Sequence, residues 1–478
     1  MKRLALAVGL LATVLAVSGG TTATAQPACV EVVLTANSGS DSVSVIDPVT
    51  DTVTGTISVG SGPRAVAIKD NTTGYVSNGG AGTVSVINPS TNAVVDTITV
   101  GNFPWGIAVS PDGTKVYVVN VSDNSVSVID TATNIVTATI LVGPFPRGVA
   151  FSPDGGKAYV TNSAGASVSV INTTTGTISG SVFGTVNSSF PVVSPGGTKV
   201  YVTAGSSNAL YAIDAATNAL TDTLPLPNSG NGVVLSSDGG TAFVTSGFSP
   251  GVLLVIDTAT NTVTGSITVG QNPQGVAISA DGGTVWVVNV NDGSLSVIDT
   301  ATSTVTTAIP IGSSPFGVAV GCISPPALAA QAVGDGRSVS VSGSNFPAAS
   351  EVTVTLGSAI LGTATTDVNG GFTAEFAITD CAVVGGSVTA TAGTRTATTD
   401  IALDPCAPTT TTTIPDSTTT PDPSPTAAPA AASTAGTLPA TGAEVAPLVA
   451  AGMALVASGT AAAALSARRR FRGHPPQN

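Results

Sequence analysis

Hydrophobic and polar residues alternate along most of the chain in short runs that return at a fixed interval. One complete unit has such runs at residues 146–151, 159–162, 168–171 and 177–182, with a Ser-Pro-Asp-Gly turn at residues 152–155. Period-two alternation between Pro, Asp and Gly turns predicts β-strands. Each unit is therefore expected to form a four-stranded antiparallel meander.

An Ile-Asp or Ile-Asn pair closes one strand of every unit, and successive pairs are 41 to 43 residues apart. The pairs are Ile46-Asp47, Ile87-Asn88, Ile129-Asp130, Ile171-Asn172, Ile213-Asp214, Ile256-Asp257 and Ile298-Asp299. A period this regular indicates a repeat architecture. Seven such sheets arranged radially bury their hydrophobic faces against one another, which predicts an all-β fold with a seven-bladed β-propeller at residues 26–322.

The run Tyr159-Val160-Thr161-Asn162 and the strand that follows it resemble the YVTN family of β-propellers, which occurs in surface-layer and other exported prokaryotic proteins. The resemblance spans residues 30–321, although the final asparagine is replaced by Ala204 and Ser246 in two copies. It implies that the Pro-x-Gly-Val strand is innermost and opens each blade. Because the chain begins on a second strand at residues 32–37, residues 316–320 are expected to supply the missing inner strand.

The same arrangement places Cys29 and Cys322 at neighbouring hairpin positions, so the resemblance implies a disulfide between them. From the sequence alone, four cysteines allow three pairings. The other two, Cys381 and Cys406, are then expected to pair with each other inside a second domain at residues 327–406.

Alternating runs at residues 338–342, 352–356 and 372–376 predict the strands of that second domain, and residues 367–371 carry a hairpin signal. The segment 343–347, Gly-Ser-Asn-Phe-Pro, is similar to immunoglobulin-like modules of exported actinobacterial proteins. We therefore expect a small immunoglobulin-like β-sandwich. After it, residues 407–437 are mostly Thr, Pro, Ser and Ala and predict a disordered stalk.

Both ends of the chain carry targeting patterns. Residues 1–25 combine Lys2 and Arg3, an apolar run and a small-residue site, which is the layout of a cleaved signal peptide. Residues 438–478 hold a five-residue motif, an apolar segment long enough for a transmembrane helix and an arginine cluster. They resemble the LPXTG-type cell-wall sorting signals of Gram-positive surface proteins, through Leu438, Pro439, Ala440, Thr441 and Gly442.

That resemblance implies a sortase-type transpeptidase and cell-wall peptidoglycan as partners, with Thr441 joined to the wall and the membrane contacted only through the carboxy-terminal helix before sorting. The expected location is the wall or surface of a Gram-positive-type bacterium. Between Gln26 and Thr441 the chain has 26 acidic and eight basic residues, a net charge near −18. Such an acidic surface excludes a nucleic-acid partner, which would require a basic face.

The residue content argues against familiar catalytic and metal sites. The single histidine, His474, lies in the segment that sorting would remove, and the cysteines have structural assignments. No cofactor, metal or catalytic residue is therefore expected, and the protein is predicted not to be an enzyme. A calcium site at Asp123 and Asn124, or at Asn291 and Asp292, is the weaker alternative, and the repeated turn aspartates are explained by turn formation.

One repeat position, at the entry to each inner strand, varies more than the rest of the unit. It is occupied by Arg64, Trp105, Arg147, Ser189, Asn231, Gln274 and Phe316. In a propeller these residues ring one mouth of the central channel, where arginine forks and an aromatic ring suit an anionic or carbohydrate ligand. The sequence thus favours a non-enzymatic surface protein that binds a protein or glycan; the alternative is an extracellular propeller lactonase, lyase or hydrolase.

Overall fold

The computed structural model describes residues 29–333, 338–379 and 385–403. These residues form 35 β-strands, and no helix capable of crossing a membrane occurs among them. The predicted signal peptide, stalk and sorting signal, and the predicted Cys381–Cys406 pair, lie outside the described residues. The fold over the described part is all-β, as the alternation predicts.

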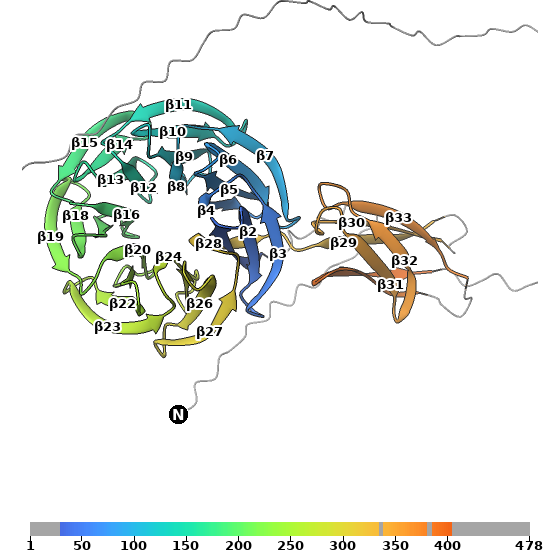
Figure 1. Ribbon diagram of the computed structural model, residues 1–478. Coiled ribbons are helices and arrows are strands. Elements are labelled where there is room, and N and C mark those ends of the chain that lie inside the picture. The colour runs from blue at the N-terminus through green and yellow to red at the C-terminus, as the bar shows by residue number, and fades with distance from the viewer. Residues whose placement is uncertain (1–28, 334–337, 380–384, 404–478) are drawn as a thin grey trace, which may run out of the picture. The chain divides into compact units, whose positions relative to one another are not determined.

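Seven four-stranded sheets form a closed ring of blades around a central channel (Figure 1). Each inner strand contacts the inner strands of both neighbouring blades, and the last, β28, contacts the first complete one, β4. The seven-bladed propeller that the 42-residue period predicts is confirmed.

We number the blades from the one that holds the first strand and list strands from the channel outward. Blade 1 contains β28 (Pro315–Ile323), β1 (Val30–Asn37), β2 (Ser42–Asp47) and β3 (Thr52–Ser58). Blade 2 contains β4 (Pro63–Asp70), β5 (Thr73–Asn78), β6 (Thr83–Asn88) and β7 (Ala93–Thr99). Blade 3 contains β8 (Pro104–Val109), β9 (Lys115–Asn120), β10 (Ser125–Asp130) and β11 (Ile135–Leu141). Blade 4 contains β12 (Pro146–Phe151), β13 (Lys157–Asn162), β14 (Ser167–Asn172) and β15 (Thr177–Phe183).

Blade 5 contains β16 (Ser188–Val193), β17 (Lys199–Ala204), β18 (Ala209–Asp214) and β19 (Ala219–Pro225). Blade 6 contains β20 (Gly230–Leu235), β21 (Thr241–Ser246), β22 (Gly251–Asp257) and β23 (Thr262–Val269). Blade 7 contains β24 (Pro273–Ile278), β25 (Thr284–Asn289), β26 (Ser294–Asp299) and β27 (Thr304–Pro310).

In blades 2 to 7 the second strand has an aromatic residue that packs into the next blade, and in blade 1 Leu34 takes this place. Tyr75 of blade 2 lies in one buried cluster with Val116 and Val118 of blade 3. At the other end of the ring, Trp286 of blade 7 packs with Val33 and Ile46 of blade 1. The hydrophobic cores therefore lie between blades, which explains why the sequence keeps a large apolar side chain at this position in copy after copy.

The asparagine that ends most second strands binds the third strand of its own blade. Asn162 Nδ2 donates to Ser169 Oγ at 2.9 Å and to Ser167 Oγ at 3.2 Å, and both serines are buried. Where blade 5 has Ala204 in place of asparagine, its third strand has Ala209 and Tyr211 in place of the two serines. The amide and its two serine partners are replaced together, so this change leaves no serine of the third strand without the amide.

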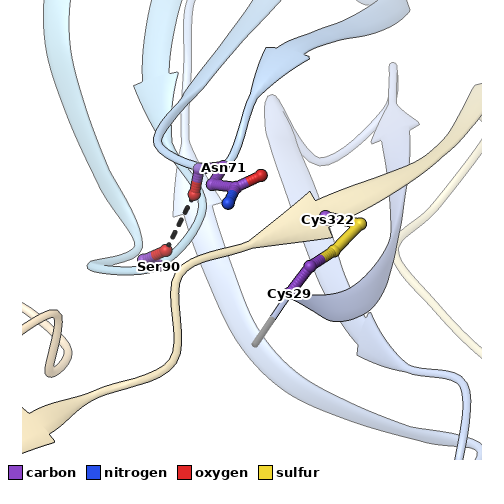
Figure 2. The surroundings of a disulfide bond; sticks show 4 residues. All are labelled: Cys29, Asn71, Ser90 and Cys322. Atoms are coloured by element: carbon purple, nitrogen blue, oxygen red, sulfur yellow. Dashed lines mark hydrogen bonds between the residues drawn. A yellow bond between two sulfur atoms is a disulfide. The ribbon is translucent and has the colours of Figure 1, made fainter. Parts of the chain in front are cut away.

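Blade 1 is built from both ends of the propeller sequence. Strand β28 pairs antiparallel with β1, with Glu31 opposite Cys322 and Val30 opposite Ile323. A disulfide joins Cys29 to Cys322 across a Cα separation of 5.4 Å, in the pairing that the family resemblance implies (Figure 2). Next to it, Ser90 Oγ donates to the Asn71 carbonyl at 3.2 Å, which fastens a loop of blade 2 beside the end of β28 (Figure 2).

A second unit follows the propeller and has two sheets. One sheet is ordered β29 (Ala327–Val333), β30 (Ser338–Ser344), β33 (Phe372–Ala377); the other is ordered β32 (Ala359–Thr365), β31 (Glu351–Leu356), β34 (Gly385–Ala392), β35 (Arg395–Ala402). Both sheets contribute to one core, in which Val341, Phe346 and Val354 are fully buried. The immunoglobulin-like assignment and the boundaries at residues 327 and 406 remain predictions.

The expected hairpin at residues 367–371 is wrong. Asp367 forms the turn, and its Oδ1 accepts hydrogen bonds from the Asn369 and Gly371 N–H groups at 2.8 Å. However, the flanking strands β32 and β33 belong to different sheets. The same Asp-x-x-Gly chemistry closes a turn whether or not the two strands pair, so the local sequence cannot tell the two outcomes apart.

Candidate functional site at the mouth of the central channel

The seven variable residues of the sequence analysis occupy one equivalent place in the fold. Each is the second residue of an inner strand, and the seven inner strands surround the channel (Figure 1). A cavity of about 270 Å³ opens there, lined by residues of all seven inner strands, among them Arg64, Ile107, Phe190 and Phe316. We call the seven positions the rim.

Four rim residues form one cluster of arginine and aromatic side chains. Arg64 Cζ lies 4.6 Å from the ring centroid of Trp105 and 4.9 Å from that of Phe316. Trp105 and Phe316 meet edge to face with centroids 5.2 Å apart, and Arg147 Cζ lies 5.3 Å from the centroid of the Trp105 ring. Two guanidinium groups thus share one indole.

Neither guanidinium has a carboxylate partner. The only salt bridge within the described residues joins Lys69 to Asp70, and no acidic side chain is among the described residues that line the cavity. Arg64 Nε and Arg147 Nε are both shielded from solvent and make no hydrogen bond to the described protein atoms. Burial lowers the pKa of both groups, and the charge of Arg147 lowers the pKa of Arg64 further. The site therefore favours the entry of a negative charge.

The other three rim residues are already engaged within the protein. Asn231 Nδ2 donates to the Pro273 carbonyl at 2.8 Å, and Gln274 Nε2 donates to Asn272 Oδ1 at 2.9 Å. Ser189 is 5% exposed. The predicted ring of seven thus divides into a cationic and aromatic half, on blades 1 to 4, and a polar half on blades 5 to 7.

Sequence reasoning missed Phe103, which also belongs to the cluster. Its ring lies 5.7 Å from that of Trp105, and Arg64 Cζ lies 5.4 Å from its centroid. Phe103 adopts φ 54°, a left-handed conformation that bulky residues rarely take, where blades 2 and 7 have Gly62 and Asn272. The aromatic residue before Pro104 was the signal available, and it is not specific, because blade 4 has Phe145 at the same position with φ 57°.

Glycine after the rim residue lets adjacent blades approach closely. A Cβ atom at Gly232 would lie 2.4 Å from the carbonyl oxygen of Gln274, the rim residue of the next blade. The same conflict, always with the rim carbonyl of the following blade, occurs at Gly106, Gly148, Gly275 and Gly317. Close packing between blades therefore explains the glycine in the five blades that have it, whereas blades 2 and 5 have Ala65 and Phe190 at this position.

Replacing Gly232 with alanine is expected to lower the free energy of unfolding by about 1–3 kcal/mol, because the new methyl group must displace backbone of blade 7. Urea denaturation of the purified variant measures the change. Gly196→Ala is the matched control, since nothing lies within 4 Å of a Cβ there. Equal free energies of unfolding for the two variants would show that blades 6 and 7 can accommodate the methyl group without cost.

The aspartates considered as calcium ligands or catalytic groups accept hydrogen bonds from neighbouring loop residues. Asp123 accepts from the Asn102 N–H at 2.7 Å and from Asn102 Nδ2 at 2.9 Å, while Asp292 accepts from the Gln271 N–H at 2.7 Å. Asp154 accepts from Ser152 Oγ and the Gly156 N–H, and these hydrogen bonds hold its pKa below the ordinary value. Within the described residues, no three His, Cys, Asp or Glu side chains are grouped to hold a metal.

Comparison with known protein families gives a match over part of the propeller. Residues 30–195 match the family model described as Lactonase, 7-bladed beta-propeller. The matched stretch covers blade 1 strands β1 to β3, blades 2 to 4 and the start of blade 5, and so contains Arg64, Trp105 and Arg147. None of the curated proteins compared with the chain is significantly similar to it.

Several solved structures share the fold. Hydrazine synthase of Kuenenia stuttgartiensis is similar at 21% identity and TM-score 0.50, covering 54% of this chain and 88% of that one. A candidate 6-phosphogluconolactonase of Bacteroides uniformis is similar at 15% identity and TM-score 0.53, covering 61% and 99%. A protein of unknown function from Desulfotomaculum acetoxidans has 15% identity and TM-score 0.53, covering 62% and 99%.

The prediction that the protein is not an enzyme is wrong in light of the lactonase match, which favours a hydrolase. That prediction assumed that catalysis needs an imidazole or a thiolate nucleophile. Opening an ester with water does not require either group when the carbonyl is polarised by fixed positive charge. The residue types that were counted as ligand-binding candidates, two arginines in a half-buried cluster, are also those that can supply such polarisation.

Proposed function

We propose that the channel mouth is the active site of a hydrolase that opens lactones carrying an anionic group. The observation that carries this proposal is the pair Arg64 and Arg147, two guanidiniums that share Trp105 and have no acidic partner among the described residues. Arg64 also lines the channel cavity. The match of residues 30–195 to the lactonase family model supports the reaction class. The description of the Bacteroides uniformis protein as a candidate 6-phosphogluconolactonase supports a phosphorylated sugar lactone.

The chemistry follows from where charge develops. Water adds to the lactone carbonyl carbon, and the carbonyl oxygen becomes negative in the tetrahedral intermediate. A half-buried guanidinium stabilises that charge strongly because little water competes for it. The bond from the carbonyl carbon to the ring oxygen then breaks, the ring oxygen takes a proton, and the hydroxy acid ionises with release of one proton. One arginine faces the carbonyl while the other binds the anionic substituent through its fork of N–H groups.

A lactone panel tests the function directly. The purified protein is assayed for proton release with 6-phosphogluconolactone, with uncharged glucono-δ-lactone and with γ-butyrolactone, each with and without Ca²⁺, Mg²⁺ and Mn²⁺. We expect acceleration over spontaneous hydrolysis, with a kcat/KM for the phosphorylated substrate at least about tenfold above that for glucono-δ-lactone, because a charge-assisted hydrogen bond contributes about 1.5–3 kcal/mol. Rates equal to those of buffer for every lactone would refute the proposal.

We further propose that the enzyme works at the cell surface. Residues 1–25, with the signal-peptide layout, and residues 438–478, with the sorting-signal layout, support export followed by attachment through Thr441. The excess of acidic over basic residues between Gln26 and Thr441 suits a solvated location away from anionic lipid. Mass spectrometry of wall-bound protein would locate the carboxy terminus: Thr441 supports attachment, and an intact residue 478 opposes it.

A further inference from the structure

A hydroxyl group at one second-strand position links adjacent blades at the rim. Thr161 Oγ1 of blade 4 accepts from the Gly148 N–H of its own inner strand at 2.9 Å and donates to the carbonyl of Ser189 in blade 5 at 2.7 Å. Thr245 does the same between the Gly232 N–H and the Gln274 carbonyl, both at 2.7 Å. We call this pair of bonds the rim link. It fixes the backbone of a rim residue against the neighbouring blade.

The rim link is distributed unevenly around the channel. All three residues of the polar half, Ser189, Asn231 and Gln274, have their carbonyls bound in this way by Thr161, Thr203 and Thr245. In the cationic and aromatic half, only the Trp105 carbonyl is bound, by Ser77. The equivalent positions before Arg147 and Phe316 are Val119 and Val288, which have no hydroxyl.

Ser77 stands at the centre of the candidate anion site. Its Oγ accepts from the Ala65 N–H at 3.1 Å, the peptide group that directly follows Arg64, and donates to the carbonyl of Trp105. One fully buried hydroxyl therefore holds the backbone on both sides of the 4.6 Å contact between the Arg64 guanidinium and the Trp105 ring. Arg64 Nε makes no hydrogen bond within the described residues, so its contacts with the neighbouring aromatic rings hold its position.

We propose that Ser77 is a positioning residue for this site: its rim link sets Trp105 against Arg64 so that the guanidinium presents its donors to an anion at the channel mouth. The inference rests on the proposed function only in taking the channel mouth as the place where the anion binds. Loss of the hydroxyl would let the two backbones move apart, and a fork that recognises phosphate depends on accurate placement.

The chain itself shows that the fold accepts valine at this position, because blades 3 and 7 have Val119 and Val288 there. Ser77→Val is therefore expected to fold, although it leaves the Trp105 carbonyl without its partner. Thr245→Val is the matched control, since it removes an equivalent rim link on the polar side of the channel. Ser77→Thr keeps a hydroxyl at this position, because threonine is the residue that blades 4, 5 and 6 have there.

The fluorescence of Trp105 can be used to follow ligand binding at the site once the other tryptophan is removed. The chain has two tryptophans, and Trp286 occupies the position where blades 2 to 5 have tyrosine, so Trp286→Tyr leaves Trp105 as the single indole. Inorganic phosphate is titrated into this background and into the same background with each of the three substitutions. Quenching or enhancement of Trp105 fluorescence gives the Kd, and thermal unfolding gives the Tm of each variant.

We expect Ser77→Val to weaken phosphate binding about tenfold, equivalent to the loss of about one hydrogen bond's contribution, while Ser77→Thr binds as the background does. Thr245→Val should lower the Tm by as much as Ser77→Val and leave the Kd unchanged. Equal Kd values for Ser77→Val and Thr245→Val would overturn the positioning role. So would a failure of the background protein to bind phosphate at concentrations up to tens of millimolar.

The inference and the proposed function fail in distinguishable ways. Phosphate binding that depends on Ser77, in a protein that hydrolyses no lactone, would support the positioning role and remove the hydrolase. Lactone hydrolysis without any phosphate binding would support the hydrolase and remove the role of Ser77.

Discussion

Replacing both Cys29 and Cys322 with serine is expected to lower the free energy of unfolding of the propeller by about 4–5 kcal/mol. The bond joins positions 293 residues apart, so it restricts the unfolded chain far more than a bond within one blade would. Denaturation by urea under non-reducing conditions, with the midpoint and slope compared with those of the wild type, measures the loss.

Ser90→Ala serves as the control for this prediction. It removes the hydroxyl that binds the Asn71 carbonyl and the Ser324 carbonyl, each at 3.2 Å, close to the disulfide but without opening the covalent ring (Figure 2). We expect it to cost about 1 kcal/mol. A cysteine double variant no less stable than Ser90→Ala would mean that the pairing of β28 with β1 closes the ring unaided.

Arg64→Ala combined with Arg147→Ala is expected to reduce kcat/KM for a phosphorylated lactone by roughly 10²–10³-fold, the loss typical of removing a group that stabilises an oxyanion. Arg64 lines the cavity and Arg147 contacts the same indole ring, so removing the pair is expected to eliminate the recognition of the anion and the polarisation of the carbonyl together. Steady-state kinetics with phosphorylated and uncharged lactones separate the two effects.

Gln274→Ala tests the opposite half of the rim. Its side chain is bound to Asn272, so its removal should change kcat/KM by less than about threefold, on the scale of one weak contact. Arg64→Lys with Arg147→Lys keeps the charge but loses the planar forks, and should recover only part of the activity. If the double alanine variant turned over the phosphorylated lactone at the wild-type rate, the active site would lie elsewhere.

The propeller could be predicted from the sequence because the pattern of one blade occurs seven times. Alternating runs fix the strands, the constant interval between Ile129-Asp130 and its equivalents fixes the number of blades, and the register of the first and last runs predicts that Phe316 and Val33 share a blade. In the second unit only one copy of each signal exists, and there the turn at Asp367 was assigned to the wrong kind of connection.

The composition of the candidate site was only partly accessible. The repeat identifies Arg64, Trp105, Arg147 and Phe316 as equivalent positions, but equivalence does not reveal which side chains meet across the channel. Their contacts depend on ring closure and on rotamers that the repeat leaves free. Neither the engaged amides of Asn231 and Gln274 nor the role of Phe103 follows from the period.

Ring closure by β28 also sets the order in which the protein can be completed. During synthesis the strands from β4 to β27 all find their sheet partners within the same blade, but β1 to β3 remain an incomplete sheet until residues 315–323 are made. Until then β1 has an unpaired edge of hydrogen-bonding groups that invites association with other chains. A nascent chain that ends before Pro315 therefore exposes this strand edge to other chains.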